Sequence, residues 1–250
     1  MAEPIESKPV PQLRIVVLIS GSGTNLQALI DAQNSFDVNA KIVLVLSNRK
    51  AAYGLIRAAD ASPPIRTAYL ALQPYLKANP DNTRDDYDAE IARIVLRARP
   101  DLVVLAGWMH VFGDGFLNLV NNAPQRAEEV PAGHGDHHES HLTDLIFPIP
   151  VINLHPALPG AFDGAQAIER AWDAYQKGEI QRTGVMVHRV VREVDAGEPI
   201  LVEEIPFREG ETQEQFETRL HGVEWKVIVS ATNKVLKDRL EQRHSRKGSE

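Results

Sequence analysis

Short runs of consecutive apolar residues alternate with amphipathic helical patterns through most of the chain. An uninterrupted aliphatic and β-branched run such as Leu13–Ile19 is typical of a strand that is buried on both faces of a parallel sheet. In the clearest helical segment, 84–97, apolar residues recur at helix spacing from Tyr87 to Val95. Strands that alternate with helices predict an α/β fold with an open, mostly parallel sheet and helices on both faces. Further strand-like runs are 42–46, 102–106 and 150–154.

The last part of the chain departs from this alternation. Two strand-like runs, 183–191 and 200–205, are joined by a turn-rich segment, which predicts a hairpin-like or crossover pairing. A long C-terminal helix is expected to begin at Thr212, because Thr212 and Gln215 have the spacing of a capping box.

Polar segments flank and interrupt the predicted core. Residues 1–11 hold three prolines and predict a flexible tail, as do the polar residues 244–250, which leaves 12–243 as a single domain. A polar insertion is expected at about 122–149. It contains four of the nine histidines, so a metal site has to be weighed, but a loop without a rigid scaffold favours a solvated surface segment. These histidines are His134, His137, His138 and His141.

Composition narrows the class of protein. The 250 residues include 27 basic and 34 acidic ones, a formal net charge of −7, which argues against a nucleic-acid partner. The absence of cysteine excludes disulfides, thiolate metal sites and cysteine nucleophiles. No apolar run approaches the roughly 20 residues of a membrane span, and the N-terminus lacks the apolar region of a signal peptide. We therefore expect a cytoplasmic protein with no membrane partner.

A glycine-rich turn, Gly21–Asn25, follows the first predicted strand and opens a helical pattern. Such a turn directs backbone N–H groups outward at the positive end of the helix dipole, which favours a phosphate, and Ser22, Thr24 and Asn25 add side-chain donors. It is not the dinucleotide fingerprint, because Leu26 occupies the third glycine position, and it is not a P-loop. A tight turn with Thr24 as the helix N-cap is the alternative.

Asn153 and His155 lie two positions apart at the end of a predicted strand, so strand alternation directs both to one face. The carboxyl ends of parallel strands are where open α/β sheets bind ligands. An amide donor beside an imidazole suits an oxyanion, since both can donate to developing negative charge. A capping asparagine next to a structurally hydrogen-bonded histidine is the other interpretation.

Asp195 lies in the turn-rich segment 194–199, whose composition is ordinary for a turn. The functional alternative is a carboxylate that reaches the imidazole of His155 and stabilises its charged form. His188, on the preceding strand, is interpreted either as an inward-facing support for this group or as a core histidine.

Taken in order, these segments resemble the phosphoribosylglycinamide formyltransferase family, and the long insertion is similar to fungal-type members. The resemblance runs from about residue 13 to about residue 236. It departs at 155–160, where His-Pro-Ala-Leu-Pro-Gly stands in place of the commoner His-Pro-Ser-Leu-Leu-Pro. The resemblance therefore does not define the shape of that loop. The segments that carry it are 19–27, 105–109, 152–156, 184–188 and 194–197.

The resemblance implies a Rossmann-like formyltransferase fold and a role for matching residues. Asn153, His155 and Asp195 match the catalytic trio of the family. Glu224 matches a carboxylate that engages the glycinamide end of the substrate, although a solvated helix-face glutamate is the alternative. His110 stands where many bacterial members have arginine, so no phosphate contact is expected there. Residues that match the phosphate site are Gly23, Thr24 and Asn25; those near the folate are Arg84, Met109, Val194, Ala196 and Gly197.

The implied activity is transfer of a formyl group from the cosubstrate 10-formyltetrahydrofolate to the amine of glycinamide ribonucleotide, in de novo purine (IMP) biosynthesis. No metal is expected, and the partners are these two small molecules, with the protein a monomer or homodimer. The alternatives are another folate-dependent formyltransferase, such as the enzyme that formylates methionyl-tRNA, a formyltetrahydrofolate deformylase, or a non-catalytic nucleotide- or folate-binding module. The phosphate turn and the absence of room for a tRNA-binding or regulatory domain favour the first activity.

Overall fold

A computed structural model describes residues 12–122 and 145–247 of the chain. Seven strands form one sheet in these residues, in the order β3-β2-β1-β4-β5-β6-β7. The first five pair in parallel, and β6 and β7 are antiparallel to their neighbours. The strands are β1 (Leu13–Ile19), β2 (Ala40–Ser47), β3 (Thr67–Tyr69), β4 (Leu102–Leu105), β5 (Val151–His155), β6 (Arg182–Arg189) and β7 (Pro199–Pro206).

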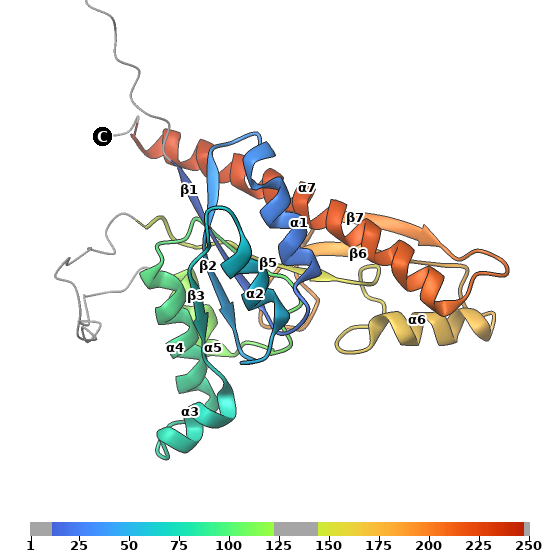
Figure 1. Cartoon of the computed structure of the whole chain (residues 1–250), viewed down its shortest axis with the longest axis horizontal. Coiled ribbons are helices and arrows are strands. Elements are labelled where there is room, and N and C mark those ends of the chain that lie inside the picture. Colours follow the sequence, from blue (N-terminus) through green and yellow to red (C-terminus); the bar gives the residue numbers. More distant parts are fainter. Residues whose placement is uncertain (1–11, 123–144, 248–250) are drawn as a thin grey trace, which may run out of the picture.

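Helices cover both faces of the sheet, as the alternating pattern predicts (Figure 1). The side chains of β1 alternate between the two layers: Leu13, Ile15, Val17 and Ile19 pack with α1, α2 and α7, while Val16 and Leu18 pack with α4 and α5. The helices are α1 (Thr24–Ala32), α2 (Tyr53–Asp60), α3 (Leu72–Ala78), α4 (Arg84–Arg97), α5 (Asp114–Asn121), α6 (Ala167–Gln176) and α7 (Gln213–Lys247), with a 3-10 turn η1 (Gln33–Ser35).

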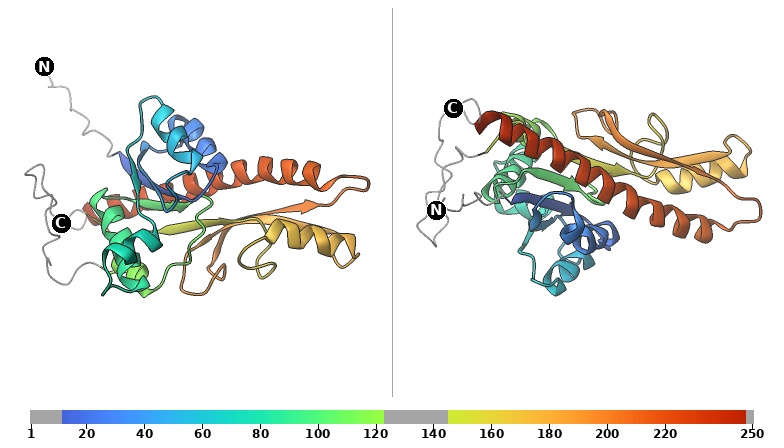
Figure 2. Two further views of the ribbon diagram at one scale, coloured as in Figure 1. Left: turned by 60° about the horizontal axis from the view of Figure 1, so that its bottom comes forward. Right: turned by 90° about the horizontal axis from the view of Figure 1, so that it is seen from above.

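Strands β6 and β7 pair as an antiparallel hairpin. Of the two pairings that the sequence left open, hairpin-like or crossover, the structure has the hairpin. Helix α7 follows and lies along the length of the molecule (Figure 2). Its capping box forms as predicted, because the N–H of Gln215 donates to the Thr212 hydroxyl and the N–H of Thr212 donates to the Gln215 amide oxygen. The expected polar tail from residue 244 is wrong in part, since the helix continues to Lys247.

The expected flexible tail 1–11 and the four histidines of the expected insertion lie outside the described residues. Leu145 and Ile149, however, are buried in the layer of α4 and α5, so the packed core resumes before residue 149. Within the described ranges, no helix combines the length and the apolar character that crossing a membrane requires.

Candidate functional site

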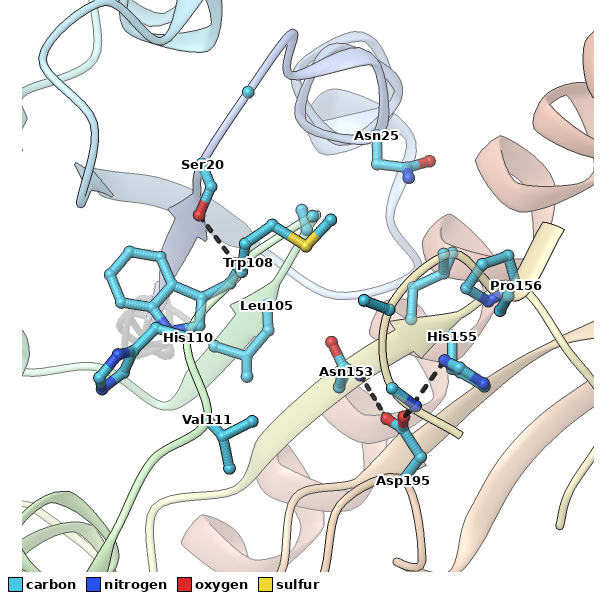
Figure 3. Close-up of a pocket in the computed structure, with 18 of the residues that line it drawn as sticks. Ser20, Asn25, Leu105, Trp108, His110, Val111, Asn153, His155, Pro156 and Asp195 are labelled. Carbon is cyan, nitrogen blue, oxygen red and sulfur yellow. Dashed lines mark hydrogen bonds and ion pairs between the residues drawn. The ribbon is translucent and has the colours of Figure 1, made fainter. Parts of the chain in front are cut away.

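A cavity of about 730 Å³ lies at the carboxyl ends of β1, β4 and β5 (Figure 3). The turn after β1, the loop after β4 and the end of β5 line it from the sheet, and the segment that leads to α6 and the loop between β6 and β7 complete its wall. This is the position at which an open α/β sheet gathers loops into a ligand site.

The turn after β1 places Gly23 in the left-handed region, at φ 72°, immediately before α1. Glycine is required there for two reasons. The positive φ is strained for other residues, and a Cβ atom on Gly23 would lie 2.6 Å from the Cα of Gly54. The alternative with Thr24 as N-cap is wrong, because Gly23 is the cap and Thr24 is the first helical residue. The first N–H groups of α1 have no partner within the helix and border the cavity, as an anion site needs.

Asn25 connects this turn to the long C-terminal helix. Its amide nitrogen lies 3.4 Å from a carboxylate oxygen of Glu224, and both side chains are buried. The solvated-glutamate interpretation is therefore wrong for Glu224. The same carboxylate oxygen lies 2.9 Å from Nδ1 of His221, and this hydrogen bond raises the pKa of His221 above its ordinary value despite the opposing effect of burial.

His221 was not predicted as a site residue. It lines the cavity together with Asn25 and Glu224. The available signal was its position three residues before Glu224, which places the two side chains on one helix face. A partly exposed imidazole with a raised pKa thus lies one contact away from Asn25, through Glu224.

Asn153, His155 and Asp195 converge at the end of β5, as Figure 3 shows. His155 is 4% exposed, and its Nδ1 lies 3.4 Å from Oδ2 of Asp195. The amide nitrogen of Asn153 donates to Oδ1 of the same carboxylate over 3.3 Å. The other ring nitrogen of His155, Nε2, is buried and has no hydrogen-bond partner among the described residues, although His155 lines the cavity.

Asp195 adopts the left-handed conformation, at φ 54°, which is uncommon outside glycine. Its carboxylate also accepts the N–H of Gly164 over 2.9 Å and lies 3.3 Å from Nε2 of His188. Burial raises the pKa of Asp195, but the hydrogen bonds from His188 and Gly164 and the nearby His155 outweigh it and hold the pKa below its ordinary value. The carboxylate is therefore held in its charged form beside the two imidazoles.

The residues expected near the folate divide into two groups. Met109, 69% exposed, and Val194 line the cavity. Arg84, Ala196 and Gly197 are not among its lining residues. The guanidinium of Arg84 donates to the carbonyl of Val111, which does line the cavity. Gly197 has a structural reason to be glycine, because a Cβ there would lie 1.6 Å from the carbonyl oxygen of Arg189.

His110 contributes to the cavity wall in a way that the sequence did not indicate. Its Nε2 lies 2.6 Å from Oδ1 of Asp88, and both side chains are buried. The second oxygen of Asp88 accepts the N–H of Gly113 over 2.7 Å. Asp88 on α4 thereby fixes the loop after β4 at two points.

One group of side chains in the described residues is close enough to hold a metal ion. His155, Asp163 and Asp195 each place one potential ligand atom within 4.8 Å of the others. His155 and Asp195 already contact each other, and Asp163 is exposed.

The match to a family model settles which protein family shares this arrangement. The model described as Formyl transferase matches residues 13–123 and 142–232, which include every strand and the whole of the cavity wall. The chain belongs to the formyl transferase family. The residues between the two matched segments, 124–141, lie within the insertion expected at about 122–149.

Curated relatives within the formyl transferase family cover nearly the whole chain. The phosphoribosylglycinamide formyltransferase of Schizosaccharomyces pombe is 43% identical over 90% of this chain and 97% of its own length. The enzyme of the same name from Dictyostelium discoideum is 44% identical over 87% of this chain and 95% of its own length. The crystal structure of glycinamide ribonucleotide transformylase 1 from Symbiobacterium toebii has a TM-score of 0.68 and 30% identity, covering 88% of this chain and 85% of that one.

Proposed function

We propose that this formyl transferase moves a formyl group from 10-formyltetrahydrofolate to the amine of glycinamide ribonucleotide. The single observation that carries the proposal is the position of Asn153, His155 and Asp195 on the same cavity as the anion turn 21–25. The first set suits transfer of an acyl group, and the second suits an acceptor that carries a phosphate. Relatives that are named for this reaction and cover nearly the whole chain support the same choice.

The reaction requires a tetrahedral intermediate. The substrate amine attacks the formyl carbon, the carbonyl oxygen takes up negative charge, and the bond from that carbon to N10 of the folate then breaks. The amide of Asn153 and the protonated imidazole of His155 are the donors for the oxyanion, and the loss of one such donor costs about 10²–10³ in rate. A proton leaves the attacking nitrogen, and one is delivered to N10.

Asp195 supports this chemistry through charge. The carboxylate of Asp195 lies 3.4 Å from Nδ1 of His155, where it orients the imidazole and offsets positive charge on the ring in the transition state. Nε2 of His155 has no hydrogen-bond partner among the described residues, and we assign it to the oxyanion in this proposal. Much of the remaining acceleration comes from holding the two reactants in attack geometry.

The acceptor occupies the side of the cavity between α1 and α7 in this proposal. The N–H groups at the start of α1 bind the phosphate, and Asn25 and Glu224 border the space between the phosphate and the trio. The folate occupies the side formed by the loop after β4 and the segment 190–195, where Met109 and Val194 are exposed apolar contacts.

A direct assay tests the proposal. The purified protein is mixed with 10-formyltetrahydrofolate, with and without glycinamide ribonucleotide, and the absorbance of the folate is followed. Turnover that requires the ribonucleotide and is abolished in His155→Ala supports formyl transfer to that acceptor. Release of formate at the same rate without the ribonucleotide would identify a deformylase. If the folate absorbance changes in neither mixture, the protein would be a non-catalytic binding module.

A further inference from the structure

The segment 156–166, between β5 and α6, reaches the carboxylate at the centre of the trio. The N–H of Gly164 donates to Oδ2 of Asp195 over 2.9 Å, and this oxygen also faces His155. The position of Gly164 therefore bears directly on the charge and the orientation of Asp195.

The backbone around Gly164 is held in an unfavourable conformation. Phe162 and Gln166 both lie in the left-handed region, at φ 53° and 58°, although neither is glycine. Such conformations cost free energy and persist only where surrounding contacts impose them. Something outside the segment must therefore hold it.

Arg170, in the first turn of α6, makes the required contacts. One guanidinium nitrogen, Nη2, donates to the carbonyl of Phe162 over 2.5 Å and to that of Asp163 over 2.7 Å. The guanidinium carbon lies 5.9 Å from the centre of the Phe162 ring, within cation–π range. Arg170 itself is exposed and does not line the cavity.

We propose that Arg170 is a positioning residue for the formyl transfer, because it fixes the carbonyls of 162 and 163 and so places the Gly164 N–H on the carboxylate of Asp195. The inference rests on the proposed function for its effect on turnover. It assigns no substrate contact to Arg170, which acts through the loop and then through Asp195.

The predicted consequence is a change in the titration of Asp195. The groups that face this carboxylate are His155 on β5, His188 on β6 and Asp163 in the loop, with Glu193 two residues earlier in its own segment. The Gly164 N–H is one of the contacts that lower the pKa of Asp195. If that donor is lost, the pKa rises, and activity that needs the charged carboxylate fails at a higher pH on the acid side.

Three variants separate this role from a general structural one. Arg170→Met keeps an apolar stem and removes the donors, whereas Arg170→Lys keeps a charge and N–H donors. Arg182→Met makes the same chemical change at an exposed ion pair with Glu204, away from the cavity, and is the matched control. We expect kcat to fall about 10- to 100-fold in Arg170→Met, with partial recovery in Arg170→Lys and no change in the control.

The second measurement does not depend on activity. Carbon-13 NMR of the carboxyl groups in the free protein follows the titration of Asp195, which an Asp195→Asn spectrum assigns. We expect its pKa, and the acid limb of the kcat profile, to move upward in Arg170→Met. An unchanged Asp195 titration in a folded Arg170→Met variant would overturn the inference even if formyl transfer is established. A shifted titration in a protein that transfers no formyl group would instead leave the positioning role intact and refute the proposed function.

Discussion

Asn153 and His188 face each other across the antiparallel pair of β5 and β6, with the amide nitrogen of Asn153 3.2 Å from Nε2 of His188. The Nδ1 atom of His188 lies 2.9 Å from the carbonyl of Arg189, so Nδ1 carries the hydrogen of that bond. Nε2 then accepts from Asn153 when His188 is neutral and donates to Asp195 when it is protonated. Because the other N–H of Asn153 donates to Asp195, Asn153 keeps an N–H for the oxyanion only when His188 is protonated and no longer accepts from it.

Replacement of Asp195 by asparagine removes the negative charge that lies 3.4 Å from Nδ1 of His155, while it keeps the size of the side chain. We expect the fold to be retained and kcat to fall by about 10²–10³, since the imidazole that stabilises the oxyanion loses its charged partner. Steady-state kinetics measure kcat, and circular dichroism checks that the fold is retained. Turnover close to that of the unaltered protein would remove Asp195 from the trio.

Asn25 contacts Glu224 and lies in the first turn of α1, so its replacement should weaken binding of the acceptor and not of the folate. In Asn25→Ala we expect KM for glycinamide ribonucleotide to rise far more than KM for the folate. Thr183→Val is a control, because Thr183 is also buried but does not line the cavity. An equal rise in both KM values would show that the phosphate assignment is wrong.

The hydrogen bond to Glu224 raises the pKa of His221 above its ordinary value near 6.5. The imidazolium therefore persists above that pH and is lost as the pH rises through the raised pKa. We expect KM for the ribonucleotide to increase over that interval, because a cation beside the anion turn disappears. His221→Gln should flatten this dependence relative to the unaltered protein when both are compared from pH 6 to 9. Parallel pH profiles for the two proteins would exclude His221 from phosphate binding.

Gly197 was expected near the folate, and its surroundings predict a different defect. A Cβ at this position would collide with the Arg189 carbonyl, so Gly197→Ala must displace the segment that carries Asp195. Overpacking of this kind costs about 1–3 kcal/mol. We expect thermal unfolding at a lower temperature together with a lower kcat. A lower affinity for folate with unchanged stability and kcat would favour the original assignment.

Much of the architecture follows from local patterns in the chain. The apolar run 13–19 and the periodic segment 84–97 coincide with β1 and α4, because both elements are buried and their side chains repeat at the period of the structure. Strand β3 carried no such signal, since it has three residues and none is fully buried. The end of α7 was also missed, because its last turns are polar and exposed.

The site residues likewise differ in whether a local sequence pattern could place them. Asn153 and His155 could be placed on one face by strand alternation alone, whereas their meeting with Asp195 depends on the antiparallel hairpin β6–β7. The pairing of His110 with Asp88 joins side chains from different elements, and a single sequence carries no spacing for such a contact. His221 differs, because it lies three residues before Glu224 on one helix, a spacing that the sequence does carry. The resemblance places Arg84 near the folate, which stays a prediction; its guanidinium donates to the backbone carbonyl of Val111 beside the cavity.

The close approach of Gly23 and Gly54 limits how the acceptor specificity of this domain can be redesigned. With no side chain between them, the anion turn and the start of α2 behave as one rigid unit, and neither backbone can be reshaped without the other. Engineering for a larger or uncharged acceptor therefore has more freedom at His221 and Glu224, the side chains that α7 contributes to the cavity lining.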